Sequence, residues 1–162
     1  MTQISLLDLS KLRLEYPTKK IVFCSGNFDL THVGHVLFFE DCKQQGNILI
    51  VGVASDNILK INKKRLIMNK NIRLKMVDSL KPVDYVLLDN VSNKENTLGL
   101  LDVVFKKLKP DVYIINDDAS NIPYRKKICK KFDVKLVILK RTCPKEFENI
   151  STTKLIKKIK FL

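Results

Sequence analysis

Short apolar runs rich in β-branched residues recur along the chain, and segments with a helical spacing of apolar positions separate them. The apolar runs predict strands near residues 20–25, 48–54, 83–88, 111–116 and 134–139. The intervening segments predict helices near residues 34–45, 56–61, 70–80, 98–108, 123–132 and 152–160. This alternation is typical of parallel strands joined by crossover helices. We therefore predict an α/β protein with a Rossmann-like, open, parallel five-stranded sheet and helices on both faces.

The N-terminal segment differs from the rest in that its leucines alternate with polar residues. We expect residues 1–19 to form an amphipathic lead-in helix and residues 20–162 to form a single domain, long enough to bury a core. The first residues do not resemble a signal or transit peptide. No apolar stretch approaches the ~20 residues that a membrane helix needs. The expected location is therefore the cytoplasm.

The chain is strongly basic, with 30 Lys and Arg against 17 Asp and Glu and a formal charge of +13. Such a charge attracts anions, including nucleic acids and polyphosphates. Because the lysines are spread along the chain with few aromatic residues between them, we expect solvated helix faces and a local phosphate site rather than nucleic-acid binding. The four cysteines show no C-x-x-C spacing, so we expect free thiols and no protein-built metal site.

The segment from Gly26 to His35 carries the clearest chemical signal. It follows a predicted strand and leads into a predicted helix, which puts His32 and His35 on the first helical turn. Backbone N–H groups there lack helical partners, and the helix dipole is positive. Two charged imidazoles would repel each other at this place unless an anion lay between them. With Gly34 allowing a ligand to approach the backbone, the segment predicts a phosphate site.

Polar residues also follow two later strands. Asn116-Asp117-Asp118 comes after the fourth predicted strand and Arg141-Thr142 after the fifth. Ligands of open α/β sheets bind beyond the carboxyl ends of the strands, so these segments and the histidine segment should meet in one crevice. We expect Asp29 to support the backbone there rather than touch a phosphate, because two negative charges repel.

Two further segments are candidates for anion binding. In the run from Ile150 to Ile156, Ser151 or Thr152 can cap the following helix, but Lys154 adds positive charge to an end that is already positive. A bound anion would resolve that conflict. The basic segment 60–65 either reaches over the crevice towards phosphate or is a solvated loop. The sequence does not decide between these two interpretations.

The H-x-G-H of His32 to His35 and the late Ile150-Ser151-Thr152-Thr153 resemble the two signature motifs of the cytidylyltransferase-like nucleotidyltransferase family. Residues 20–64 resemble the adenylyltransferase domain of bacterial heptose-phosphate enzymes, and residues 55–86 align without gaps with glycerol-3-phosphate cytidylyltransferase. Class I aminoacyl-tRNA synthetases share H-x-G-H, but they are much larger and carry a lysine-serine signature that this chain lacks.

The resemblance implies transfer of a nucleoside monophosphate from CTP or ATP to a sugar-phosphate or polyol-phosphate, with release of pyrophosphate, in the synthesis of a surface-polysaccharide precursor. It implies Mg²⁺ carried by the triphosphate and water, and it allows a homodimer. One alternative is a cofactor-forming adenylyltransferase of the FAD or coenzyme A pathway. The other is a non-catalytic nucleotide-binding or RNA-binding module.

The resemblance also assigns roles to residues. The catalytic group is His32, His35 and Lys64. The nucleotide-binding group is Gly26, Asn27, Phe28, Gly34, Asp117, Arg141, Thr142, Ser151, Thr152 and Thr153. Lys60 and Lys63 are rivals of Lys64 for the contact with phosphate and are grouped with the acceptor. Arg73 matches an arginine of the acceptor or structural region. The chain departs from the family pattern at Asn27, where threonine or cysteine is usual, in the widened segment 143–149, and at residues 116–118, where heptose enzymes are glycine-rich.

Overall fold

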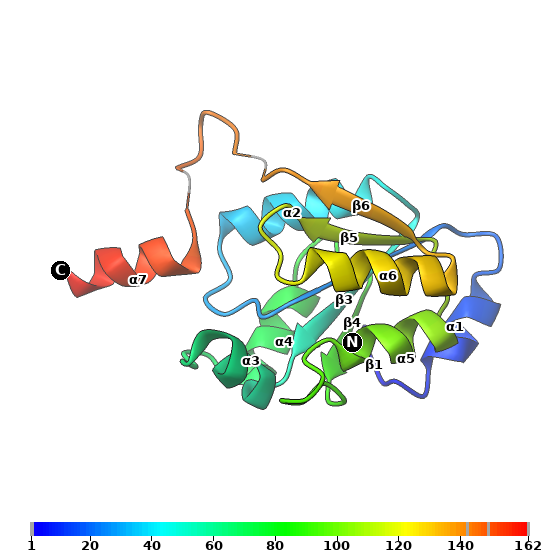
Figure 1. Ribbon diagram of the computed structural model, residues 1–162. Coiled ribbons are helices and arrows are strands. Elements are labelled where there is room, and N and C mark those ends of the chain that lie inside the picture. The colour runs from blue at the N-terminus through cyan, green and yellow to red at the C-terminus, as the bar shows by residue number, and fades with distance from the viewer. Residues whose placement is uncertain (1, 142, 149, 162) are drawn as a thin grey trace.

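A six-stranded parallel sheet forms the centre of the protein in the computed structural model, which describes residues 2–141, 143–148 and 150–161 (Figure 1). The spatial order of the strands is β1-β4-β3-β2-β5-β6, and every described pairing is parallel. The strands are β1 (Gln3–Ile4), β2 (Ile21–Gly26), β3 (Ile48–Ala54), β4 (Tyr85–Asp89), β5 (Val112–Asn116) and β6 (Lys135–Leu139). The predicted Rossmann-like α/β fold is confirmed.

The strand that the sequence did not predict is β1, at the edge of the sheet. Gln3 pairs with Val86 and Ile4 with Leu87 of β4. Two residues are too few to show an alternating pattern, so the hydrophobic periodicity gave five strands where the sheet has six. Residues 1–19 were predicted as a helix only; they contribute this strand to the sheet as well as a helix.

The described part of the chain contains seven helices, and five of them build a core on each face of the sheet. The first core joins α1, α5 and α6 to one face, with Phe23 and Tyr113 stacked at its centre. The second joins α2 and α4 to the other face around Phe39 and Val51. The helices are α1 (Leu9–Glu15), α2 (Val33–Lys43), α3 (Asp56–Lys63), α4 (Lys70–Asp78), α5 (Gly99–Lys107), α6 (Ile122–Phe132) and α7 (Thr152–Lys160).

The strand order creates a crevice in the middle of the sheet. After β2 the chain adds β3 and β4 on one side, and it then crosses back to place β5 and β6 on the other. The connections that leave the carboxyl ends of β2 and β5 therefore diverge to opposite sides, and a ligand-sized gap forms between them. Helix α7 projects from the body beside this crevice and contributes no buried side chain (Figure 1).

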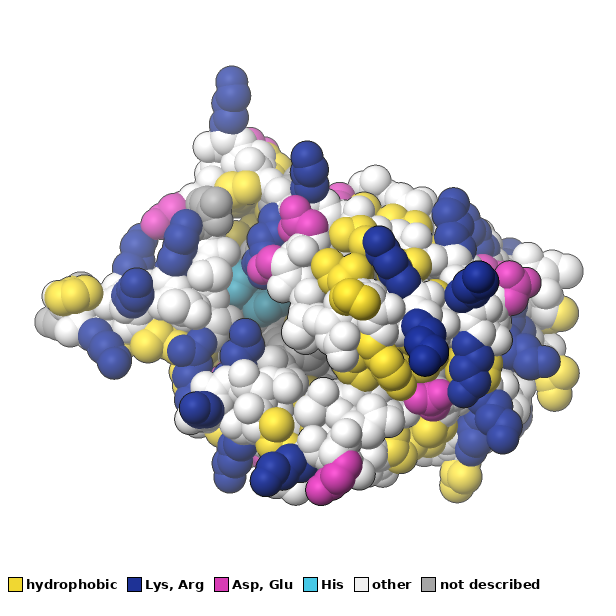
Figure 2. All heavy atoms as spheres, in the orientation of Figure 1, with side chains coloured by type: hydrophobic (Ala, Val, Ile, Leu, Met, Phe, Trp, Pro, Cys, Tyr) yellow, Lys and Arg dark blue, Asp and Glu magenta, His cyan; other side chains and the backbone are white. Residues whose placement is uncertain are grey.

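The basic side chains and the cysteines are distributed over the fold as follows. Lysine and arginine side chains are scattered over the face seen in Figure 2 rather than gathered in one patch, and the histidines lie in a hollow between α7 and the body. All four cysteines are free, with Cys143 exposed and the other three buried. Among the described helices, none has the length and apolar character needed to cross a bilayer.

Candidate active site

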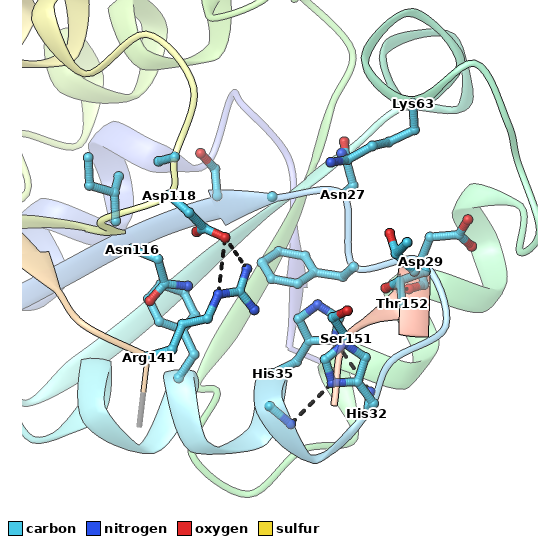
Figure 3. A pocket seen from close by; sticks show the side chains of 18 of the residues that line it. Asn27, Asp29, His32, His35, Lys63, Asn116, Asp118, Arg141, Ser151 and Thr152 are labelled. Atoms are coloured by element: carbon cyan, nitrogen blue, oxygen red, sulfur yellow. Dashed lines mark hydrogen bonds and ion pairs between the residues drawn. The ribbon is translucent and has the colours of Figure 1, made fainter. Parts of the chain in front are cut away.

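A hollow of about 370 Å³ opens at the carboxyl ends of β2 and β5. We call it the histidine hollow, because His32 and His35 form one of its walls (Figure 3). The end of β2 and the start of α2 line it from one direction, and Asn116, Asp118 and Arg141 line it from another. Residues Ser151 to Thr153 close it from the side of α7. The predicted convergence of three segments in one crevice is therefore present.

The two histidines cap helix α2 reciprocally. Nδ1 of His32, the residue before the helix, accepts a hydrogen bond from the backbone N–H of Gly34 at 3.1 Å. Nδ1 of His35 accepts one from the backbone N–H of His32 at 3.3 Å. Serine and glutamate usually make this arrangement, called a capping box. Here the imidazoles satisfy the helix start and are stacked on each other, with ring centroids 4.0 Å apart.

This arrangement fixes the protonation of both rings. An imidazole nitrogen that accepts a backbone hydrogen bond carries no proton, so the proton of the neutral ring lies on Nε2. Burial, with smaller contributions from His32 and Arg141, lowers the pKa of His35 to about 3. Burial and then Arg141 also lower the pKa of His32. Both rings are therefore neutral near pH 7, and each keeps one Nε2–H donor for a ligand.

Glycines make room for these rings. A Cβ atom on Gly34 would lie 3.0 Å from Cε1 of His32, so a side chain here would press on the capping imidazole. A Cβ on Gly26 would lie 2.9 Å from the ring of Phe28, which adopts a left-handed backbone conformation with φ of 50°. Phe28 in turn packs edge-on against His35, with centroids 5.5 Å apart. The motif glycines and Phe28 thus position the histidines.

The start of α7 is anchored to the histidine segment across the hollow. Oγ1 of Thr152 donates to the backbone oxygen of Asp29 at 2.9 Å. Ser151 caps the helix, because its side chain accepts from the N–H of Lys154 at 3.3 Å. Nη2 of Arg65 lies 3.5 Å from Oγ1 of Thr153. The late Ser-Thr-Thr motif is therefore held at the same hollow as the histidines, although Thr152 follows His32 by 120 positions in the sequence.

The carboxylate of Asp29 supports the loop that precedes α4. Asp29 is 6% exposed, and its oxygens accept hydrogen bonds from the N–H groups of Ile67 at 3.2 Å and Met68 at 2.8 Å. This geometry matches the supporting role expected from the sequence. It also neutralises part of a negative charge that would otherwise face an anion in the hollow.

Arg141 lines both hollows and pairs with Asp118. Its Nη2 lies 2.6 Å from Oδ2 of Asp118, and both side chains are about half exposed. An exposed pair of this kind contributes little to stability, so a stronger anion can take the place of the carboxylate.

A second hollow of about 380 Å³ adjoins the first on the side of β3 and β4. We call it the neighbouring hollow. Asp89 and Ala54 line it at the ends of β4 and β3, and Thr97 and Leu98 line it from the start of α5. The residues that line both hollows mark the boundary between them: Ser25, Gly26, Asn27, Lys63, Asp118, Ala119, Arg125 and Arg141.

Most residues predicted for the site line the histidine hollow. They are Gly26, Asn27, Phe28, His32, Gly34, His35, Lys63, Arg141, Ser151, Thr152 and Thr153. Asp117 does not line either hollow; its backbone N–H continues the sheet by donating to Leu139. Thr142 lies outside the described residues.

Of the three lysines predicted to reach phosphate, only Lys63 lines the hollows. Lys64 ends helix α3 in a left-handed conformation, with φ of 53°. Neither Lys64 nor Lys60 is among the lining residues. The catalytic role of Lys64 stays a prediction, and the geometry favours Lys63 as the phosphate-facing lysine.

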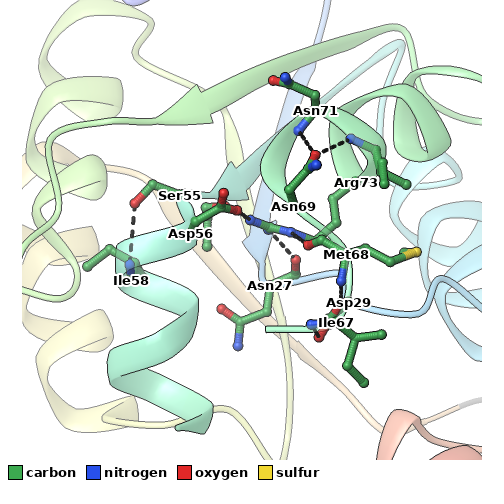
Figure 4. A network of polar contacts seen from close by, with 12 residues as sticks. Asn27, Asp29, Ser55, Asp56, Ile58, Ile67, Met68, Asn69, Asn71 and Arg73 are labelled. Carbon is green, nitrogen blue, oxygen red and sulfur yellow. Dashed lines mark hydrogen bonds and ion pairs between the residues drawn. The ribbon is translucent and has the colours of Figure 1, made fainter. Parts of the chain in front are cut away.

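Arg73 does not match its predicted contact with the acceptor phosphate, because its side chain is fully buried outside both hollows. Nε donates to the oxygen of Met68 at 2.9 Å, and Nη1 donates to the oxygens of Asn27 and Ala54 at 2.7 Å each. Nη2 pairs with Asp56 at 2.8 Å (Figure 4). Arg73 therefore fixes the backbone behind the site and has no donor pointing into it.

Sequence reasoning missed Arg125, which lines both hollows and is only 8% exposed. It stands in a lysine-rich helix that looked solvated. The available signal was the spacing: Arg125 shares a helical face with Ile128 and Cys129, three and four positions later, and both are buried. Asn116 and Asp118, which the sequence placed in this crevice without a role of their own, also line the histidine hollow, and so does Arg65 of the basic segment.

Comparison with known proteins finds relatives that match most of this chain. A bifunctional protein HldE of Helicobacter pylori is 37% identical over 98% of this chain, which spans about a third (32%) of that protein. A FAD synthase of Aciduliprofundum boonei is 31% identical and covers 85% of this chain and 89% of its own length.

Solved structures extend the likeness to the fold. A lipopolysaccharide core biosynthesis protein of Thermoplasma volcanium superposes with a TM-score of 0.62 at 26% identity, covering 78% of this chain and 98% of its own. A pantoate-beta-alanine ligase of Francisella tularensis, at 16% identity and a TM-score of 0.63, shares the fold. The cytidylyltransferase-like family matches residues 23–158, which include both motifs and nearly all of the sheet, and this chain belongs to that family of nucleotidyltransferases.

Proposed function

We propose that the protein transfers a nucleoside monophosphate from CTP or ATP to a sugar-phosphate or polyol-phosphate and releases pyrophosphate. The observation that carries this proposal is the meeting of His32 and His35 with the Ser151–Thr153 turn in one hollow. The stacked imidazoles offer two neutral Nε2–H donors, and the starts of α2 and α7 both present positive dipole ends. A polyphosphate is the ligand that uses all of these donors together.

The chemistry follows from what these donors can do. In-line transfer between phosphates needs alignment and stabilisation of charge, and no covalent intermediate with the protein. The acceptor phosphate is already ionised at neutral pH, so it attacks the α-phosphate without a general base. The Nε2–H groups of His32 and His35 then stabilise the negative charge that grows on the α-phosphate oxygens. Arg141 exchanges its partner Asp118 for phosphate oxygens of the nucleotide.

Mg²⁺ is part of this proposal as a companion of the triphosphate. Among the described residues, no group of three or more His, Cys, Asp or Glu side chains is placed to hold a metal ion. In this proposal the ion is bound mainly by triphosphate oxygens and water, which are the ligands that Mg²⁺ prefers. When bound, the ion would neutralise phosphate charge.

The comparisons bear on which substrates to test first. The FAD synthase relative, which by its name makes an adenine-containing product, favours ATP over CTP. It also keeps a FAD-forming adenylyltransferase as a second candidate function. The lipopolysaccharide core biosynthesis protein, by its name, favours a role in the synthesis of a surface-polysaccharide precursor.

The deciding experiment measures pyrophosphate release with each of ATP and CTP in the presence of Mg²⁺. Acceptors are a panel of sugar and polyol phosphates, with FMN as the test of the second candidate. Release that depends on one nucleotide and one small phosphate supports the proposal, whereas release only with FMN supports the second candidate. Strong, salt-sensitive RNA binding with no release for any acceptor would instead favour a binding module.

A further inference from the structure

Arg125 is a buried cation without an anionic partner. Its side chain is 8% exposed, and no described carboxylate forms an ion pair with it. Nε donates to the backbone oxygen of Ser120 at 2.8 Å, and Nη1 donates to the phenol oxygen of Tyr113. Both acceptors are neutral. Burying a charge with only neutral partners is costly, and a bound anion would offset that cost.

One nitrogen of the Arg125 guanidinium, Nη2, has no partner in the described part of the chain. A guanidinium has five N–H groups, and two of them have described partners. No buried side-chain nitrogen or oxygen in the described part of the chain lacks a hydrogen-bond partner. Nη2, which has none, must therefore open to the hollows that Arg125 lines. Arg125 also stands in the first turn of α6, where Asn121 gives no side-chain cap and the helix dipole adds positive potential.

The position of Arg125 decides which anion it would meet. It lies with Lys63 at the boundary between the histidine hollow and the neighbouring hollow. If the triphosphate occupies the histidine hollow, the group that attacks its α-phosphate must come from the other side of that boundary, since transfer is in line. For the proposed reaction that group is the phosphate of the acceptor.

The far end of the neighbouring hollow is suited to hydroxyl groups. Asp89 is 6% exposed, and its Oδ1 accepts from the N–H groups of Val91 at 3.2 Å and Ser92 at 2.9 Å. Within the described residues no donor reaches Oδ2, which is therefore open to the hollow that Asp89 lines. Thr97 lines the same end. A carboxylate held in this way accepts hydrogen bonds from hydroxyls and repels a second phosphate.

We propose that the neighbouring hollow is the acceptor site, in which Arg125 and Lys63 bind the phosphate and Asp89 selects a polyhydroxylated body. This inference rests on the proposed function for the direction of attack. The binding chemistry itself, a phosphate monoester with hydroxyls at its other end, follows from the side chains of the hollow alone.

The test measures binding of inorganic phosphate and of glycerol 3-phosphate by calorimetry, with and without a non-hydrolysable nucleotide. Arg125→Met should weaken binding of both ligands about tenfold or more, because it removes a buried, charge-assisted contact. Lys126→Met is the matched control, since Lys126 is exposed on the same helix and the change removes the same charge. It should leave both affinities within about twofold of wild type. Asp89→Asn should lower the affinity for glycerol 3-phosphate more than the affinity for inorganic phosphate.

The outcomes separate this inference from the proposed function. Equal phosphate affinity in wild type and Arg125→Met overturns the inference, as does the absence of phosphate binding at millimolar concentration in wild type. Loss of nucleotide affinity in Arg125→Met that matches the loss of phosphate affinity also overturns it, because Arg125 would then serve the triphosphate. Should Arg125→Met fail to fold, Arg125→Lys keeps the charge and loses the planar donors, and a smaller loss of phosphate affinity with unchanged nucleotide affinity is expected. Phosphate binding through Arg125 without any nucleotide binding would overturn the proposed function, but it would support the phosphate site in the neighbouring hollow.

Discussion

Two buried arginines come from helices on opposite faces of the sheet, Arg73 from α4 and Arg125 from α6, and their surroundings differ. Arg73 is paired with Asp56 and donates to three backbone oxygens, so its charge and four of its five N–H groups are satisfied within the protein. Arg125 has two neutral acceptors and no described carboxylate, and it lines both hollows. A buried charge whose counter-ion and hydrogen-bond acceptors all lie within the protein indicates a structural role. A buried charge without a counter-ion beside a cavity indicates a binding site for an anionic ligand.

The same contrast holds for the regions around the two residues. Around Arg73 the network ties the end of β3, the motif loop at Asn27 and the loop at Met68 into one closed unit (Figure 4). Around the histidine hollow the polar groups converge on open space (Figure 3). We therefore expect substitutions in the first region to change stability and those in the second to change binding and turnover.

The largest expected effect is on folding, from Arg73→Met. Removing one partner of a buried, hydrogen-bonded pair should lower the free energy of unfolding by about 3–5 kcal/mol, because three backbone oxygens and Asp56 lose their donor. Chemical denaturation measures the change. Lys75→Met is the control, since Lys75 is exposed on the same helix α4. A loss below about 1 kcal/mol would show that the closed network is not structural.

The second effect is on turnover, from His35→Ala. The change should lower kcat by about a hundredfold or more, since one donor to the transition state is lost. It should cost only about 1 kcal/mol of stability, through the lost bond to the N–H of His32. Glu40→Ala, an exposed change on the same helix, is the control. Near-normal turnover of the folded variant would remove His35 from the mechanism.

The two regions differ in how much of their structure could be predicted from the sequence. The histidine pair and the Ser-Thr-Thr turn were predicted to share a crevice, because the carboxyl ends of parallel strands meet at one edge of the sheet. The roles of Arg73 and Arg125 were beyond the same reasoning, although the helical spacing to Ile128 and Cys129 could have shown that Arg125 is buried. Their roles depend on which oxygens surround each guanidinium in three dimensions. Arg73 reaches backbone oxygens of Asn27 and Ala54, which are distant in sequence, whereas Arg125 has only Ser120 and Tyr113 as described acceptors. The edge strand β1 was also missed, since two residues carry no periodicity.

The third effect is a loss of stability in acid, which the two histidines of the histidine hollow should produce. The pKa of His35 is lowered to about 3 and that of His32 is also lowered, so the unfolded chain binds more protons below pH 6.5. Stability should therefore fall as the pH drops from 6.5, by about 2 kcal/mol for His35 between pH 6.5 and 5. Thermal denaturation of wild type and His35→Asn at several pH values measures this. Parallel curves would contradict the inference that His35 is neutral. A bound nucleotide should flatten the wild-type curve, because its phosphates favour the charged imidazoles.

The smallest effect concerns the link between α7 and the body. Thr152→Val removes the hydrogen bond to the oxygen of Asp29 while keeping the shape of the side chain. The loss of about 1 kcal/mol should weaken nucleotide binding roughly fivefold, because the start of α7 is no longer held against the hollow. Thr152→Ser keeps the hydroxyl and should bind as wild type does, and calorimetric titration with ATP or CTP compares the three proteins. If Thr152→Val also binds the nucleotide as tightly as wild type, the late motif acts without this hydrogen bond. The nucleotide is then held in the histidine hollow by the histidines and Arg141 alone.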